Sequence, residues 1–219
     1  MSASLAAIPI RAVLLDMDGT LVDAFAPIVY ALNRTLRDFG RALMSERDIK
    51  RHTGRGECSM ISLFGAEREE AARHFLRFHD EKLYDISPLP GAEAMLRFLQ
   101  GRQLPSAIVT SKSQQRAELQ LQHLGWRHYF ACVVGLEEGR RQKPDPHTIQ
   151  LACAELDVPP ETAVMIGDGT ADMKAARRAG ALPLGLVGHF SAAEMRDAGA
   201  AACFTDLHEV LAWLRERIH

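Results

Sequence analysis

Hydrophobic residues in the first third of the chain follow two different patterns. An unbroken apolar run over residues 12–15 predicts a short buried strand. Further on, residues 25–39 are predicted to form an amphipathic helix, because apolar residues recur on one helix face at Phe25, Ile28, Val29, Leu32, Leu36 and Phe39. A polar loop with Gly54 and Gly56 is expected next. A second helix is then expected from about residue 67 to residue 84, with an apolar stripe of Ala71, Phe75, Phe78 and Leu83.

After residue 88 the pattern changes to short apolar runs that alternate with helical spacing. Pro88 and Pro90 mark the change, because proline cannot continue a helix interior. The predicted strands are residues 107–110, 131–134 and 163–166, with a further apolar stretch at 182–187, and the predicted helices are residues 92–100, 114–124, 147–156 and 171–179. This alternation is typical of a parallel α/β sheet. We therefore predict a sheet-containing core from residues 1–21 and 88–219, with a helical insertion over residues 22–87.

Composition and charge narrow the classes of function. The 219 residues are 47% hydrophobic, which is enough for one good core and a small second domain. The net charge of −2 provides no basic surface for nucleic acid. The cysteines show no metal-binding or disulfide spacing; they are Cys58, Cys132, Cys153 and Cys203. No segment approaches the length of a membrane span, and we expect a cytoplasmic protein with no membrane or nucleic-acid partner.

Two carboxylates follow the first predicted strand, in the sequence Asp16-Met17-Asp18-Gly19-Thr20. Ligands of an open parallel sheet gather at the carboxyl ends of its strands, so these acids are expected to face a crevice. Close carboxylates repel one another unless a cation or a shared proton holds them, and Mg²⁺ bound by few carboxylates leaves room for phosphate oxygens. One aspartate is then placed to attack phosphorus while the other moves protons. The alternative is a solvated turn that Gly19 makes permissive.

Polar residues recur at the ends of the later predicted strands. Thr110-Ser111 offers hydroxyls to a phosphate or caps the next helix, and Lys143 is a candidate charge neutraliser or a solvated loop residue. Asp168 and Asp172 follow the strand at 163–166, where Asp172 is alternatively an ordinary first-turn acid. Taken together, acid, hydroxyl, ammonium and acid at four strand ends match the requirements of phosphoryl transfer.

Over essentially its full length the chain resembles the haloacid dehalogenase superfamily of aspartate-nucleophile phosphatases. The resemblance lies in four motifs: Asp16-x-Asp18-Gly-Thr-Leu-Val-Asp23, Thr110-Ser111, Lys143-Pro-Asp145-Pro and Gly167-Asp168-x-x-x-Asp172. It implies a Rossmann-like core with a helical cap inserted after the first motif.

The resemblance also implies a role for each motif residue. Asp16 would form an aspartyl-phosphate, and Asp18 would protonate the leaving oxygen and later activate water. Thr110 and Lys143 would hold the phosphoryl group, with Ser111 contributing to substrate binding. The metal ligands implied for Mg²⁺ are Asp16, the backbone carbonyl of Asp18, Asp168 and, directly or indirectly, Asp172.

Within the superfamily, Asp18 disfavours dehalogenation and C–P cleavage, because members with those activities do not carry the second aspartate. The Gly19-Thr20 ending favours a phosphatase over a sugar phosphomutase. Two positions depart from the usual pattern. Gly169 replaces the Ser or Thr usual after Asp168, and Ala24 replaces the Ser often found after Asp23.

The insertion carries a candidate substrate-binding loop. The stretch Arg51-His-Thr-Gly-Arg55-Gly and the stretch Leu63-Phe-Gly65 resemble the cap of phosphoglycolate phosphatases. Arg51 and Arg55 are therefore candidates to bind a substrate carboxylate, and the alternative is a solvated turn.

We predict a Mg²⁺-dependent phosphatase of a small, phosphoglycolate-like metabolite that acts as a monomer or homodimer. The alternatives are a β-phosphoglucomutase-like phosphomutase and a non-catalytic phosphate-sensing module.

Overall fold

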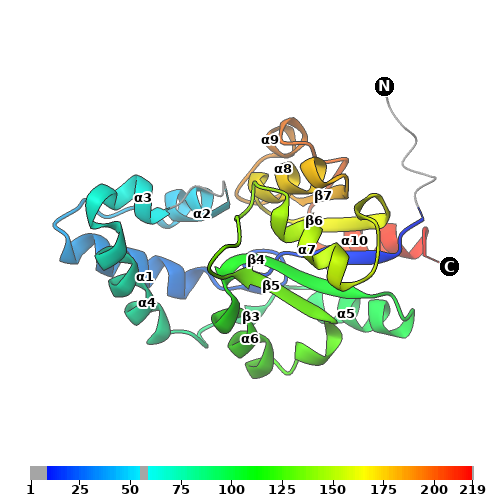
Figure 1. Ribbon diagram of the computed structural model, residues 1–219, viewed down its shortest axis with the longest axis horizontal. Coiled ribbons are helices and arrows are strands. Elements are labelled where there is room, and N and C mark those ends of the chain that lie inside the picture. Colours follow the sequence, from blue (N-terminus) through cyan, green and yellow to red (C-terminus); the bar gives the residue numbers. More distant parts are fainter. Residues whose placement is uncertain (1–8, 55–58, 219) are drawn as a thin grey trace.

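The computed structural model describes residues 9–54 and 59–218, and a parallel sheet lies at its centre (Figure 1). Among these residues, six strands form the sheet in the order β5-β4-β1-β6-β7-β8. Their bounds are β1 Ala12–Leu15, β4 Ser106–Ser113, β5 Cys132–Leu136, β6 Ala163–Gly167, β7 Leu182–Leu186 and β8 Ala202–Phe204. Because β1 pairs in parallel with β4 on one side and β6 on the other, the carboxyl ends of these three strands meet.

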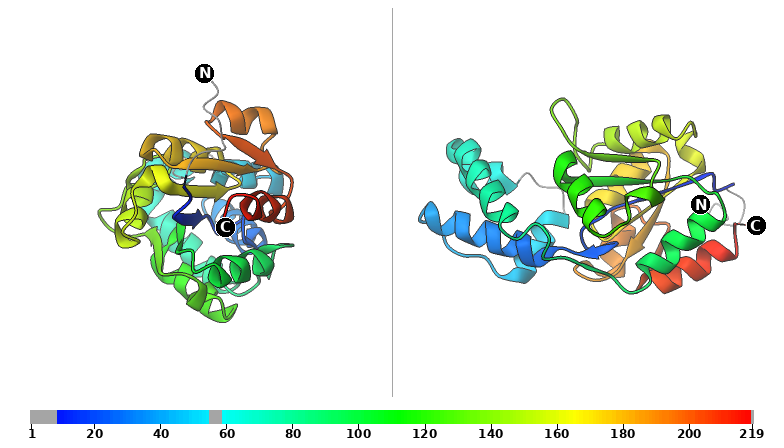
Figure 2. Two further views of the ribbon diagram at one scale, coloured as in Figure 1. Left: turned by 90° about the vertical axis from the view of Figure 1, so that its right-hand side faces the viewer. Right: turned by 90° about the horizontal axis from the view of Figure 1, so that it is seen from below.

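Helices cover both faces of the sheet (Figure 2), which confirms the predicted α/β class. One face packs against α5 (Ala92–Gly101), α6 (Gln114–His123) and α10 (Leu207–Arg215), and the other against α7 (His147–Glu155) and α8 (Thr170–Ala179). The remaining elements outside the helical insertion are η2 (Arg127–Tyr129), η3 (Pro160–Thr162) and α9 (Ala192–Asp197), of which α9 packs beside α8 and β8.

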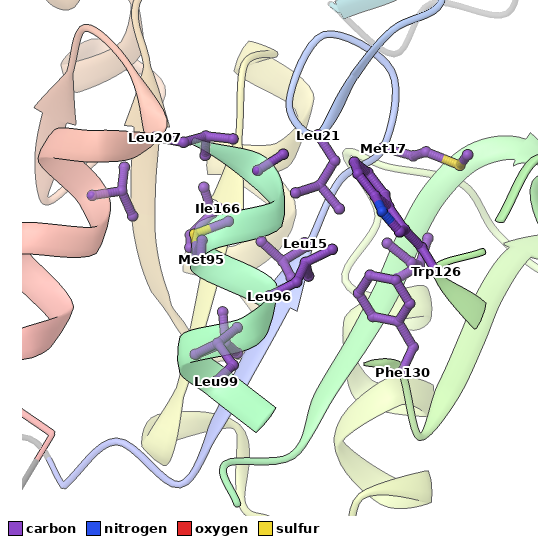
Figure 3. Packing of buried hydrophobic residues seen from close by; sticks show 14 of the residues in the cluster. Leu15, Met17, Leu21, Met95, Leu96, Leu99, Trp126, Phe130, Ile166 and Leu207 are labelled. Carbon is purple, nitrogen blue, oxygen red and sulfur yellow. The ribbon is translucent and has the colours of Figure 1, made fainter. Parts of the chain in front are cut away.

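The alternation of side chains along the strands explains why both faces need helices. Val13 and Leu15 of β1 belong to one hydrophobic cluster, whereas Ala12 and Leu14 belong to the cluster on the opposite face. Figure 3 shows Leu15 close to Met95 and Leu96 of α5, in the same cluster as the Trp126 and Phe130 rings that follow α6. All of β1 is therefore buried, and the residues that follow it are held in a rigid position.

Residues between two short strands form the helical insertion. Strand β2 (Val22–Asp23) pairs antiparallel with β3 (Ser87–Pro88), and between them lie α1 (Phe25–Asp38), α2 (Glu46–Gly54), α3 (Ser59–Phe64), η1 (Gly65–Glu67) and α4 (Arg68–Asp80). These helices extend beyond the carboxyl ends of the sheet strands (Figures 1 and 2). They share a hydrophobic cluster of their own: Phe25, Ile28, Leu32, Leu36, Ile49, Phe64 and Ala71.

The structure corrects the element predictions at two places in this insertion. Residues 46–54, expected as a polar loop, form α2. The helix has only one core apolar side chain, Ile49, so it shows no apolar period, and its start is stabilised by the Asp48 amide, which donates to the Ser45 hydroxyl at 3.1 Å. In addition, α4 ends at Asp80 and not near residue 84.

Within residues 9–54 and 59–218, none of the helices combines the length and the apolar composition needed to cross a bilayer.

Candidate active site

Two acidic residues sit where neighbouring strands of the sheet end. Asp16 follows β1 and Asp168 follows β6, and the Asp16 amide continues the pairing of these strands by donating to the Ile166 carbonyl at 2.9 Å. Thr110 lies in β4, on the other side of β1. The parallel sheet therefore gathers the first, second and fourth predicted motifs at one edge, as expected for parallel strands.

Lys143 reaches the same edge from the loop before α7 and is only 3% exposed. Its Nζ atom donates to the Val109 carbonyl at 2.8 Å and to the Asp16 carboxylate at 2.8 Å, and it pairs with Asp172 at 2.6 Å. Burial alone would lower the pKa of Lys143, but the two carboxylates outweigh it and raise that pKa. Lys143 is therefore a permanent cation between two acids.

Asp16, Asp168 and Asp172 form a buried carboxylate cluster in which one oxygen from each lies within 4.8 Å of the others. Burial, and then the charge of Asp16, raises the pKa of Asp168 well above its ordinary value. Burial likewise raises the pKa of Asp172 to about 6, although Lys143 opposes this shift. Three acids with one cation leave an excess of buried negative charge, which a divalent cation would neutralise.

Hard oxygen donors of this kind suit Mg²⁺. Asp168 also accepts a hydrogen bond from the Thr20 hydroxyl at 3.2 Å, and Asp172 accepts one from the Gly169 amide at 2.9 Å. Because Asp172 is held by Lys143 and by this amide at the start of α8, it has less freedom to bind a metal than Asp168 has. The residues present therefore fit a magnesium ion, with Asp16 and Asp168 as its candidate carboxylate ligands.

Gly19 explains why the first motif carries glycine after its second aspartate. Its φ of +82° lies in the left-handed region that favours glycine, and a Cβ atom at this position would overlap the Asp168 carboxylate. The loop after β1 therefore approaches the loop after β6 more closely than any larger residue allows.

A cavity of about 340 Å³ opens over these groups. Its floor contains the predicted residues that the structure brings together: Asp16, Asp18, Thr110, Ser111, Lys143, Asp168 and Asp172. The opposite wall comes from the helical insertion and is mainly apolar, with Phe25, Ile28 and Leu32 of α1 and Phe75 and Leu76 of α4. The cavity therefore combines a charged floor with an apolar roof.

Of the two arginines predicted to bind substrate, the structure describes only Arg51, and Arg51 does not line this cavity. Arg51 donates to the His189 carbonyl and to the Glu194 carboxylate, each at 2.6 Å, and its guanidinium lies over the Phe190 ring at 4.7 Å. Arg51 thus joins α2 to α9 and to the segment before it, and does not line the cavity. Arg55, with Gly56, lies outside the described residues.

The sequence analysis missed three ionisable residues that line the cavity. Lys112 follows Thr110-Ser111 directly, Arg116 lies on α6, and His79 lies in the last turn of α4. Arg116 donates through two nitrogens to Asp80, each at 2.7 Å, and so joins the end of α4 to the core. Adjacency to the second motif was the only signal available for Lys112, and no motif marked the other two.

His79 is a buried base without a partner for its Nδ1 atom among the described residues. Burial, followed by the positive charges of Lys112 and Arg116, lowers the pKa of His79 to about 4. Between pH 6.5 and 4, such a histidine is neutral in the folded protein and takes up a proton when the protein unfolds. The free energy of unfolding therefore decreases as the pH falls through that range.

We expect the free energy of unfolding of the wild type to fall more steeply between pH 6.5 and 4 than that of His79→Leu. The difference should reach on the order of 3 kcal/mol by pH 4, at about 1.4 kcal/mol per pKa unit. Urea unfolding of both proteins at several pH values measures it. Parallel curves would mean that His79 is protonated as readily in the folded chain as in the unfolded one.

Sequence comparison identifies the family. A family model described as haloacid dehalogenase-like hydrolase matches residues 13–184. A phosphoglycolate phosphatase from Rhodospirillum rubrum is 29% identical over 218 residues, which is 93% of this chain and 90% of that protein. Another, plasmid-encoded, from Cupriavidus necator is 34% identical over 189 residues, or 82% of this chain and 81% of that protein.

Solved structures agree with this match. A haloacid dehalogenase-like family protein from Streptococcus pneumoniae has a TM-score of 0.83 at 26% identity, covering 94% of this chain and 98% of its own. A haloacid dehalogenase-like hydrolase from Bacteroides fragilis has a TM-score of 0.86 at 25% identity, covering 92% and 99%. The motif geometry, the sequence match and the shared fold together establish that this chain belongs to the haloacid dehalogenase-like hydrolases.

Proposed function

We propose that this chain is a Mg²⁺-dependent phosphatase that hydrolyses a small phosphorylated metabolite through an aspartyl-phosphate. The observation that carries the proposal is the hydrogen bond from Lys143 to Asp16 on the cavity floor, beside the buried acids. It holds a carboxylate in a fixed direction where a phosphate can enter, and supplies positive charge for the phosphate oxygens. A cation and a held nucleophile are the protein groups that phosphoryl transfer requires.

Two aspartates carry the reaction. One oxygen of Asp16 attacks phosphorus, the bond between phosphorus and the ester oxygen breaks, and Asp18 gives its proton to the leaving oxygen. In the second half, Asp18 takes a proton from water as the water oxygen attacks phosphorus and the bond to Asp16 breaks. Inorganic phosphate and the alcohol are released, and both aspartates return to their starting states.

The other floor residues hold the substrate. The Thr110 and Ser111 hydroxyls and the Lys143 ammonium are assigned to the phosphoryl oxygens. Asp16, Asp168 and the Asp18 carbonyl would hold Mg²⁺, with Asp172 acting mainly through its contact with Lys143. When bound, Mg²⁺ supplies positive charge to the transferring group.

The helical insertion serves as the cap in this proposal, with residues 22–87 as a unit that covers a core of residues 1–21 and 88–219. The paired strands β2 and β3 form its two connections to the core. Arg51 and Arg116 would hold the cap against the core through Glu194 and Asp80. Water is then kept from the site while the ester is cleaved.

The proposed substrate is phosphoglycolate or a similar small phosphorylated acid. The names of the similar phosphatases support this choice. We also propose that the chain works in the cytoplasm, as a monomer or homodimer.

Phosphate release from a panel of small phosphoesters with Mg²⁺ tests the function. The panel contains phosphoglycolate, sugar phosphates, nucleotides and pyrophosphate, and an Asp16→Asn preparation made in parallel corrects for contaminating phosphatases. We expect release from phosphoglycolate at least tenfold above that control. An isomerised sugar phosphate without free phosphate would indicate a phosphomutase, and binding without turnover would indicate a sensing module.

A further inference from the structure

Lys112 is a buried cation to which none of the four motifs gives a role. It lies in β4, two residues after Thr110, and its side chain is only 4% exposed. Its Nζ atom donates to the Asp18 carboxylate at 2.7 Å and also to the side-chain oxygen of Gln120. The hydrogen bond between an ammonium and a carboxylate is strong and directional, so Lys112 restricts how the Asp18 side chain can turn.

Gln120 continues this contact toward the helical insertion. It is fully buried on α6, and its Nε2 atom donates to the Leu83 carbonyl at 2.7 Å. Leu83 lies between α4 and β3, on the connection that returns from the insertion to the core. A chain of hydrogen bonds therefore runs from this connection through Gln120 and Lys112 to Asp18.

Only one orientation of the Gln120 amide satisfies both neighbours. The ammonium of Lys112 can only donate, so it requires the amide oxygen, and the Leu83 carbonyl can only accept, so it requires the amide nitrogen. A flipped amide would set donor against donor and acceptor against acceptor in a buried place, which is costly. The donors and acceptors of Lys112 and Leu83 therefore fix the orientation of the Gln120 amide in this chain of hydrogen bonds.

We propose that Lys112 and Gln120 are positioning residues for the proposed phosphatase. They hold the Asp18 carboxylate in a fixed position relative to the connection that returns from the cap to the core. Lys112 occupies one carboxylate oxygen and leaves the other to exchange a proton with the leaving oxygen and with water. Gln120 fixes the ammonium in turn. This inference rests on the proposed function, because it assigns Asp18 the transferred proton.

Leaving-group dependence separates positioning from a general structural role. An alkoxide needs a proton from Asp18 to leave, whereas para-nitrophenolate leaves without one. Lys112→Met keeps an unbranched side chain of nearly the same length and removes its charge. We expect it to lower kcat on phosphoglycolate by about a hundredfold, the scale of a small misplacement of a catalytic group. Formation of the aspartyl-phosphate from para-nitrophenyl phosphate should change by less than about threefold, in line with a step that needs no general acid.

The second half of the reaction gives another readout. Water still needs Asp18 as a base, so the variant should release para-nitrophenol in a rapid burst equal to the enzyme concentration and then turn over slowly. Gln120→Leu should show the same pattern with a smaller loss, about three- to tenfold, since the Lys112–Asp18 pair remains. Lys174→Met, at an exposed position of α8, is the matched control and should behave as the wild type.

The outcomes are distinct. Equal losses on both substrates without a burst, or no loss in either variant, would overturn the positioning role. If circular dichroism shows that Lys112→Met does not fold, Gln120→Leu decides by the same criteria. Absence of phosphate release by the wild type on every ester would instead refute the proposed function.

Discussion

Replacing Asp16 with asparagine should abolish phosphate release while leaving the protein folded. Asparagine has the shape of aspartate but lacks the charge and the nucleophilic oxygen, so kcat should fall by several orders of magnitude, the scale seen when a covalent nucleophile is lost. Steady-state phosphate release measures this loss. The variant should still fold, because the buried Lys143 ammonium keeps the Asp172 carboxylate as a partner at 2.6 Å.

Stability provides an independent readout of the same variant. Asp16→Asn removes one charge from a crowded cluster, so the melting temperature of the metal-free variant should be at least that of the wild type. Asp197→Asn, at an exposed position at the end of α9, is the matched control and should keep full activity. If folded Asp16→Asn retained activity within about tenfold of the wild type, or about 1.4 kcal/mol in barrier height, the covalent mechanism would be wrong.

The strand ends of this chain were predictable because parallel topology fixes where they meet. Asp16 and Lys143 are 127 positions apart in sequence, yet each was identified from its place after a strand or before a helix. Once strands β4, β1 and β6 pair in parallel, their polar ends have only one edge of the sheet to occupy. The family motifs then indicated which of these side chains to expect at the cavity.

Contacts that depend on exact side-chain direction were not predictable in the same way. The pairing of β4 with β5 shifts register between Val109 and Ser113. The face of the sheet on which the Lys112 side chain lies could therefore not be inferred from the alternation of an ideal strand. Arg51 was predicted to bind a substrate carboxylate because its stretch resembles the cap of phosphoglycolate phosphatases. Its partner Glu194 lies 143 residues away on a helix that no pattern predicted. Neither contact leaves a periodic signal in the sequence.

Removal of divalent metal should abolish turnover, and added Mg²⁺ should restore it. Asp16 and Asp168 crowd negative charge that Lys143 only partly offsets. Burial, and then the charge of Asp16, raises the pKa of Asp168 well above its ordinary value. Ca²⁺ should restore activity poorly, since it prefers larger and looser coordination. Unchanged turnover in excess chelator would rule out the proposed metal site.

Thermal unfolding separates metal binding from catalysis. Mg²⁺ at about a hundred times its dissociation constant should stabilise the folded chain by about 2.7 kcal/mol. At roughly 2–4 °C per kcal/mol, this corresponds to a rise in melting temperature of about 5–10 °C. Asp168→Asn should lose most of this rise together with turnover, whereas Asp197→Asn should keep both. A full Mg²⁺-dependent rise in Asp168→Asn would place the ion elsewhere, because an amide oxygen in place of a buried carboxylate cannot supply the negative charge on which this site depends.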